Sequence, residues 1–150
     1  MRFFMNCTDP KTKQELPAIL PTRADRGSAG YDFYLPVDIN ILPGETILIP
    51  TNVKAYMQHD EVLLLYVRSS IGIKRHCVLA NGTGVIDSTY YNNPDNNGNI
   101  TIALTNVGKQ VQTFNKGDRI MQGVFVKYLT TIDDQPLTRT RKGGIGSSGA

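Results

Sequence analysis

The 150-residue chain has few of the residues that build disulfide-stapled or metal-bound domains. Its two cysteines, Cys7 and Cys77, form no disulfide framework, and no Cys-x-x-Cys pair or Cys/His cluster has the spacing of metal ligands. A chain of this length buries about two-thirds of its unfolded surface and folds without disulfides. We therefore predict one domain over residues 1–150, with reduced thiols.

The chain also lacks long apolar runs and a strong charge of either sign. No stretch approaches the roughly 18 apolar residues of a transmembrane helix, and the apolar start at residues 1–7 is too short for a signal peptide. The net charge of +3 is smaller than that of general nucleic-acid binders, which carry dense basic patches. These absences predict a cytoplasmic protein that binds neither membranes nor nucleic acid.

Long amphipathic helices are absent too, and strand patterns dominate. The alternation of apolar and polar residues, or short apolar runs, predicts strands at residues 28–35, 37–42, 46–49, 52–57, 62–67, 99–105 and 119–128. The run at 62–67 is typical of a strand buried on both faces, and Gly123 marks a bend or bulge. Glycine and proline punctuate the chain at intervals of about ten residues, which favours an all-β fold, a distorted β-barrel or jelly-roll-like sandwich.

Three further segments complete the predicted organisation. One short helix of about two turns is expected at residues 69–75, with Ser69 or Ser70 as its N-cap. The polar insertion at 92–98 is expected to cap a hairpin at the surface. From about residue 130 the polarity rises, and residues 139–150, here called the tail, are predicted to be flexible and to order only against a ligand or another subunit.

Chemistry-bearing residues concentrate in three segments, at 68–70, 84–90 and 143–149. The first and last combine hydroxyls, backbone N–H groups and nearby positive charge, which phosphate oxygens require. In the middle segment Asp87 ends an apolar strand, either as a turn-forming residue or as a general base that takes a proton from water. Gln122 is a candidate to hold the same water. Together the three segments indicate a nucleoside triphosphate site.

The order of five segments resembles the motifs of the homotrimeric dUTPase (deoxyuridine triphosphatase) family. They are residues 29–33 (Ala-Gly-Tyr-Asp-Phe), 68–74 (Arg-Ser-Ser-Ile-Gly-Ile-Lys), 81–90 (Asn-Gly-Thr-Gly-Val-Ile-Asp-Ser-Thr-Tyr), 117–122 (Gly-Asp-Arg-Ile-Met-Gln) and 143–149 (Gly-Gly-Ile-Gly-Ser-Ser-Gly). The resemblance spans roughly residues 29–149. It implies hydrolysis of dUTP to dUMP and pyrophosphate, with Mg²⁺ on the triphosphate oxygens.

The resemblance also implies a role for each matching residue. Asp87 would activate the water that attacks the α-phosphorus, and Gln122 would help to hold that water. Asp32 would support either the water shell of the metal or neighbouring polar groups. The substrate-binding residues would be Arg68, Ser69 and Ser70 at the α- and β-phosphates, Asn81, Gly84, Val85 and Ile86 along the uracil edge, Tyr90 beneath the deoxyribose, Arg119 of the fourth motif, and Arg141, Gly144, Ile145, Ser147 and Ser148 of the fifth. The fifth motif would close over the nucleotide from a neighbouring subunit of a homotrimer with shared active sites.

Three departures from the family pattern affect these expectations. Ile145 stands where the family usually has a phenylalanine that stacks on uracil. The arginine before the glycines matches either Arg139 or Arg141. Tyr90 leads into the 92–98 insertion, where the family usually continues Tyr-x-Gly.

Two other functions compete with dUTP hydrolysis. The related dCTP deaminases place a catalytic glutamate where this chain has Ala103, so no deaminase activity is expected. The tail and the insertion also suit a regulatory module that binds a protein partner and uses the nucleotide as a switch. Turnover separates the two, since a pure switch would bind dUTP without hydrolysing it.

Overall fold

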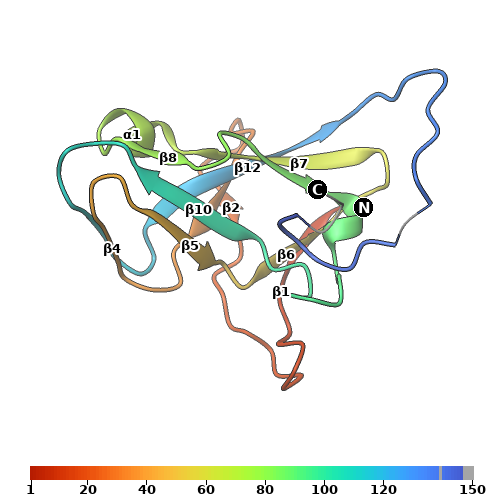
Figure 1. The fold of residues 1–150 in the computed structure, drawn as a ribbon, viewed down its shortest axis with the longest axis horizontal. Coiled ribbons are helices and arrows are strands. Elements are labelled where there is room, and N and C mark those ends of the chain that lie inside the picture. Colours follow the sequence, from red (N-terminus) through yellow and green to blue (C-terminus); the bar gives the residue numbers. More distant parts are fainter. Residues whose placement is uncertain (139, 147–150) are drawn as a thin grey trace.

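The computed structural model describes residues 1–138 and 140–146 (Figure 1). They form strands joined by turns, with one short α-helix and one 3-10 turn. The strands are β1 (Phe3–Asn6), β2 (Thr22–Arg23), β3 (Tyr31–Tyr34), β4 (Ile39–Ile41), β5 (Thr46–Pro50), β6 (Val53–Tyr56), β7 (Glu61–Val67), β8 (Cys77–Leu79), β9 (Gly84–Asp87), β10 (Thr101–Asn106), β11 (Gln112–Phe114) and β12 (Arg119–Lys127). The helix is α1 (Ser69–Ile73), and the 3-10 turn η1 (Ser88–Tyr90) follows β9 directly.

The strands pair into four open sheets in the described part of the chain. The largest has the order β2-β3-β12-β7-β9, a second has β5-β10-β8, and two-stranded sheets join β1 to β6 and β11 to β4. All these pairings are antiparallel. The predicted all-β, jelly-roll-like class is therefore confirmed, whereas a closed barrel is not formed by residues 1–138 and 140–146.

Strand β10 shows how the alternating pattern builds the core. Ile100, just before the strand, and Ile102 and Leu104 within it are fully buried. Ile102 lies opposite Ile49 of β5, and Leu104 lies opposite Leu79 of β8. Burying an aliphatic side chain of this size contributes about 1.5–3 kcal/mol, so these positions anchor the second sheet.

The apolar run in β7 is buried throughout on one face but only partly on the other, where Val62 is buried and Tyr66 is exposed, which corrects our expectation of burial on both. Leu63 and Leu65 point into the core, but Tyr66 is 37% exposed to solvent. By the period of two along a strand, Leu64 and Tyr66 belong to the opposite face. The outer face of this sheet is thus apolar and partly open to solvent.

Gly123 does not form the predicted bulge. The register shift in β12 lies between Arg119 and Met121, while Gly123 pairs in register with Tyr31. A Cβ on Gly123 would lie 2.9 Å from Leu63 Cδ1 and 3.1 Å from Phe33 Cε2. Position 123 therefore requires glycine, because core side chains pack directly against its backbone.

The helix and the insertion also differ from their predictions. Helix α1 has only five residues, and its N-cap is Arg68, with extended backbone and no capping side chain, rather than Ser69 or Ser70. The insertion at 92–98 caps no hairpin, because β9 pairs with β7 whereas β10 pairs with β5 and β8. It carries the chain between two sheets, and its Asn93 is buried rather than at the surface.

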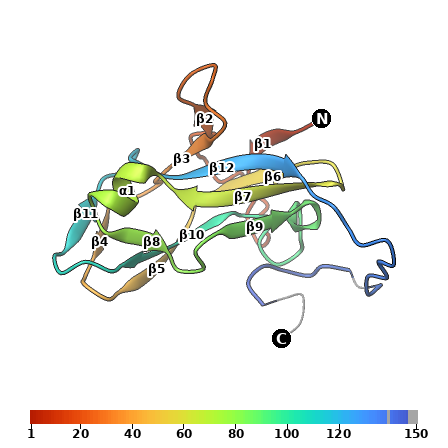
Figure 2. The same cartoon turned by 90° about the horizontal axis from the view of Figure 1, so that it is seen from above.

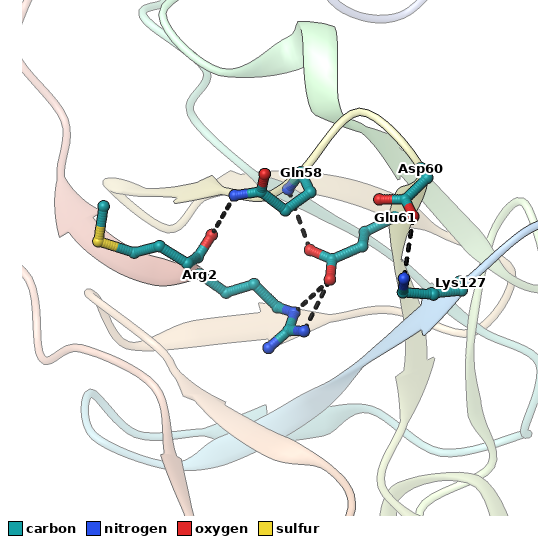
Figure 3. Close-up of polar contacts among 6 residues, drawn as sticks. Arg2, Gln58, Asp60, Glu61 and Lys127 are labelled. Carbon is teal, nitrogen blue, oxygen red and sulfur yellow. Dashed lines mark hydrogen bonds and ion pairs between the residues drawn. The ribbon is translucent and has the colours of Figure 1, made fainter.

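An ion-pair cluster holds the start of the chain to β7 (Figure 3). The Arg2 guanidinium lies 2.7 Å from the buried carboxylate of Glu61, which also accepts the backbone N–H of Gln58 at 3.0 Å. The Gln58 N–H, followed by Arg2, lowers the pKa of Glu61. Beside them Lys127 pairs with Asp60 at 3.1 Å.

Within the described ranges, no helix has the length and apolarity needed to cross a membrane.

Candidate active site

A cavity of about 270 Å³ lies beside β9 and unites many of the predicted substrate-binding residues. Its walls are formed by Leu65, Leu79, Asn81, Gly84, Val85, Ile86, Tyr90, Thr101, Ala103, Met121, Arg141, Gly144 and Ile145. Gly84 is required at this place, because a Cβ there would lie 2.8 Å from the Cβ of Leu65. Apolar walls with a few polar groups suit a flat, partly polar ring.

Asp87 lies at the end of β9, where the tail reaches it. Arg141 Nη2 contacts Asp87 Oδ2 at 2.6 Å, and Arg141 Nε donates to Thr89 Oγ1 at 3.1 Å. The Asp87 side chain is 50% exposed and the Arg141 side chain 18%. The carboxylate thus has a cationic partner and remains open to solvent, as a group that activates water must be.

Tyr90 closes one side of the cavity from η1 and is held by the insertion. Its hydroxyl donates to the Asn99 carbonyl at 2.8 Å and accepts from Asn96 Nδ2 at 2.8 Å. Burial raises the pKa of Tyr90, which favours the neutral phenol, and the two hydrogen bonds fix the position of its ring. The guanidinium of Arg141 lies 5.9 Å from the ring centroid.

A second cluster forms at the other end of the large sheet. Asp32 of β3 lies between two arginines: Arg68 Nε is 3.1 Å from Oδ1 and Arg119 Nη1 is 3.2 Å from Oδ2. The Asp32 side chain is 7% exposed. Both carboxylate oxygens are engaged, so the geometry supports the expectation that Asp32 orders neighbouring polar groups rather than a metal's water shell.

Gln122, Ser69 and Ser70 belong to this second cluster. Gln122 lies opposite Asp32 in the β12–β3 register, and a Cβ on Gly30 would collide with its side-chain oxygen. The two serines follow Arg68 as the first residues of α1, and both are exposed. Two arginines around one carboxylate, beside two hydroxyls, make a surface that attracts anions.

The two clusters are too far apart within one chain to share a water molecule. Asp87 pairs with Val62 of β7, whereas Gln122 pairs with Tyr66, on the opposite edge of the same strand. Four residues along β7 and two strand spacings separate Asp87 from Gln122 by about 16 Å between Cα atoms. Our expectation that they hold the same water is therefore not met within a single subunit.

The described part of the tail, 140–146, lies against its own chain, and our expectation that the tail orders against a ligand or another subunit stays a prediction. Figure 2 shows it turning back beneath β9 after leaving the end of β12. Of the two candidate arginines, Arg141 occupies the site, while Arg139, Ser147 and Ser148 fall outside the described residues. Ile145 lines the cavity but is 85% exposed.

Several residues in these contacts escaped the sequence analysis. Thr89 holds Arg141, Asn96 and Asn99 hold Tyr90, and Asp95 meets the tail. Only their nearness to Tyr90 in the sequence could have drawn attention to them.

Residues 1–138 and 140–146 contain no group of three or more His, Cys, Asp or Glu side chains able to hold a metal ion.

Comparisons with known proteins match most of the chain. A family model described as dUTPase matches residues 17–149. A deoxyuridine 5'-triphosphate nucleotidohydrolase of Lactococcus lactis subsp. lactis is 45% identical over 132 residues, covering 87% of this chain and 88% of the relative. The crystal structure of dUTPase from Streptococcus mutans matches with a TM-score of 0.74 at 40% identity, over 85% of this chain and 97% of that one.

A more distant match shows the fold alone. A dUTPase of Staphylococcus bacteriophage 80alpha aligns at 23% identity with a TM-score of 0.67, over 91% of this chain and 96% of that one. Phage dUTPases are described there as controlling transfer of virulence genes by a G protein-like mechanism. Together the fold, the cavity and the closer matches define an enzyme that hydrolyses a nucleotide. The chain belongs to the dUTPase family, the dUTP nucleotidohydrolases.

Proposed function

We propose that the chain hydrolyses dUTP to dUMP and pyrophosphate, with Asp87 as the base that activates the attacking water. The observation that carries this proposal is the cavity beside β9, which the tail joins to a half-exposed carboxylate through Arg141. A carboxylate that abstracts a proton must reach the water directly, within about 3 Å. The open side of Asp87 allows this approach.

The cavity supports selection of uracil and deoxyribose. Asn81 and the backbone of 84–86 supply hydrogen-bonding groups along one wall, and Leu65 packs against Gly84 behind them. The close packing of Leu65 on Gly84 keeps this wall from retreating before an extra methyl on the base. The ring of Tyr90, fixed by its two hydrogen bonds, is suited to lie beneath the sugar and to exclude a 2′-hydroxyl. Ala103 offers no proton-transferring group, so deamination is not proposed.

The second cluster would receive the triphosphate. Arg68 is oriented by the buried Asp32, and the hydroxyls of Ser69 and Ser70 stand next to it. Gln122 would help to hold the water beside them. Charge on the phosphates must be screened before the α-phosphorus is attacked, and positioned cations provide that screening.

Mg²⁺ would be held mainly by the triphosphate. No acidic cluster is found among the described residues, and both oxygens of Asp32 face arginines. Mg²⁺ commonly binds through substrate phosphates and retained waters, with few protein ligands. The residues present therefore fit a metal that arrives with its nucleotide and screens the phosphate charge there.

We further propose that the complete site forms between subunits of a homotrimer. The cluster around Asp87 and the cluster around Arg68 and Gln122 are called here the two half-sites. They lie about 16 Å apart, at the two ends of the outer face of the large sheet. That face exposes apolar side chains, among them Tyr66, Val85 and Val126. Another copy packed against it would bury these residues and bring the Asp87 end of one chain to the Arg68 end of another.

A second role, binding a protein partner under nucleotide control, has one supporting observation. The tail lines the same cavity that would take the base, so nucleotide binding would change the surface that the tail presents. The gene-transfer control described for phage dUTPases belongs to proteins of the same fold.

We also propose a cytoplasmic location, where the two free, buried thiols stay reduced.

Pyrophosphate release with Mg²⁺ from dUTP, dTTP, dCTP and UTP tests the proposed activity. Release from dUTP alone supports it. Binding of dUTP without release favours the regulatory role, and release of ammonia from dCTP would show a deaminase instead.

A further inference from the structure

Lys54 of β6 is a buried lysine that belongs to neither half-site. It is 6% exposed, and no carboxylate of the described residues forms an ion pair with it. Its ammonium group instead donates to Asn92 Oδ1 at 2.6 Å and to Asn97 Oδ1 at 2.8 Å. A charge removed from water needs such partners, because burying it without them is very costly. Lys54 therefore binds the two asparagines that supply these oxygens firmly.

The two asparagines stand near opposite ends of the insertion. Both have a left-handed backbone, with φ of 56° at Asn92 and 61° at Asn97, which residues with a Cβ keep only where their surroundings hold them. The Lys54 ammonium also lies 5.2 Å from the centroid of the Tyr91 ring, a contact that favours a cation over a neutral group. One ammonium thus joins the two ends of the insertion and stabilises their backbone.

Between these ends the insertion holds the ring of Tyr90. Asn96 Nδ2 donates to the Tyr90 hydroxyl at 2.8 Å. Asn93 Nδ2 donates to the Tyr90 carbonyl at 2.9 Å and to Asn96 Oδ1 at 2.7 Å, so the amide of Asn96 is itself oriented. The contacts therefore continue from the Lys54 ammonium through the insertion to a ring that lines the cavity beside β9.

We propose that Lys54 is a positioning residue for sugar selection. By closing the insertion at both ends, it keeps Asn96 on the Tyr90 hydroxyl and so holds the ring in place. This inference rests on the proposed hydrolysis of dUTP, in which that ring lies beneath the deoxyribose. A close-packed ring excludes an added 2′-hydroxyl only while it cannot move away. Lys54 would therefore raise the preference for dUTP over UTP without touching either nucleotide.

Lys54→Met tests the inference, because it removes the ammonium and keeps an unbranched side chain. We expect the ratio of kcat/KM for dUTP to kcat/KM for UTP to fall about tenfold, and hydrogen–deuterium exchange in the peptide 91–99 to become faster. Both substrates are measured on one protein sample, so a loss of folded protein lowers both kcat/KM values equally and leaves their ratio unchanged. Lys109→Met, at an exposed lysine, is the matched control and should keep the wild-type ratio.

Two further variants separate positioning from general damage. Asn92→Gly removes one acceptor at an exposed residue and suits the left-handed backbone, so the ratio should fall in the same direction even if Lys54→Met does not fold. In an Asn96→Ala chain the bond to Tyr90 is already gone, and adding Lys54→Met should change the ratio little further. An unchanged ratio in Lys54→Met or Asn92→Gly, or the full tenfold fall on top of Asn96→Ala, would overturn the proposal.

Failure of the proposed activity is recognised separately. If the wild-type chain binds dUTP without hydrolysing it, the ratio of the dissociation constants for UTP and dUTP replaces the kinetic ratio and should fall likewise in Lys54→Met. A wild-type chain that binds neither nucleotide would refute the proposed function and the sugar role together. Unchanged exchange of the peptide 91–99 in Lys54→Met would refute the hold of Lys54 on the insertion, whether or not dUTP is hydrolysed.

Discussion

The two aspartates at the ends of the large sheet have the same side chain in opposite surroundings. Asp32 is 7% exposed and bound by Arg68 and Arg119, whereas Asp87 is 50% exposed and bound by Arg141. A carboxylate with both oxygens held by arginines is suited to orient them, and an open one to take a proton from water. We therefore propose that their surroundings, rather than the residue type, give Asp32 a structural role and Asp87 a chemical one.

Replacement of the open carboxylate should have the largest effect. Asp87→Asn keeps the shape but removes the base, so kcat for dUTP should fall by at least about 10²-fold. The free energy of unfolding should change little, because the side chain is half exposed. Initial rates of pyrophosphate release and urea unfolding measure both. A variant with wild-type kcat would remove Asp87 from the mechanism.

Replacement of the buried carboxylate should show the reverse pattern. Asp32→Asn leaves two guanidinium groups without their anion and should cost about 1–3 kcal/mol of unfolding free energy. KM for dUTP should rise because Arg68 loses its orientation. The exposed Asp133→Asn is the matched control in the same urea titration. Unchanged stability together with lost kcat would exchange the roles assigned to the two aspartates.

The sequence predicted the parts of each region that depend on local pattern. Alternation placed Ile100, Ile102 and Leu104 in the core, and the segment ending at Asp87 was recognised as a strand. The bulge before Met121 and the pairing of Asp32 with both arginines were not predictable, since both depend on strand register. The tail contact with Asp95 was missed because it joins residues far apart in the chain.

Tyr90→Phe tests the link between the insertion and the cavity, with a smaller expected effect. The change removes the bonds to Asn96 and Asn99 while leaving the ring. Loss of about 1 kcal/mol should lower Tm by about 2–4 °C. KM should rise modestly, since the ring of Tyr90 lines the cavity and loses both bonds that hold its hydroxyl. Calorimetry with no shift in Tm would show that these hydrogen bonds contribute nothing net.

The smallest effect is expected at Glu61, whose carboxylate is held by Arg2 and the Gln58 N–H rather than by an arginine of either region. Its lowered pKa stabilises the folded state above about pH 4.3, the ordinary glutamate value, and this stabilisation is lost as the pH falls through the lower folded-state value. Glu61→Gln should therefore be less stable than wild type at pH 7, with the difference disappearing in acid. Urea unfolding at several pH values and one protein concentration checks this. A difference independent of pH would point to packing instead.

Subunit complementation tests most directly the claim that two half-sites from different chains form the active site. Asp87→Asn chains and Arg68→Gln chains, each expected to be inactive, are refolded separately and as an equal mixture, and pyrophosphate release from dUTP is measured. The account predicts recovery in the mixture to about a quarter of wild-type activity, the share of interfaces that join two intact halves in randomly mixed cyclic oligomers. A mixture that forms mixed oligomers but stays as inactive as its parents would contradict it.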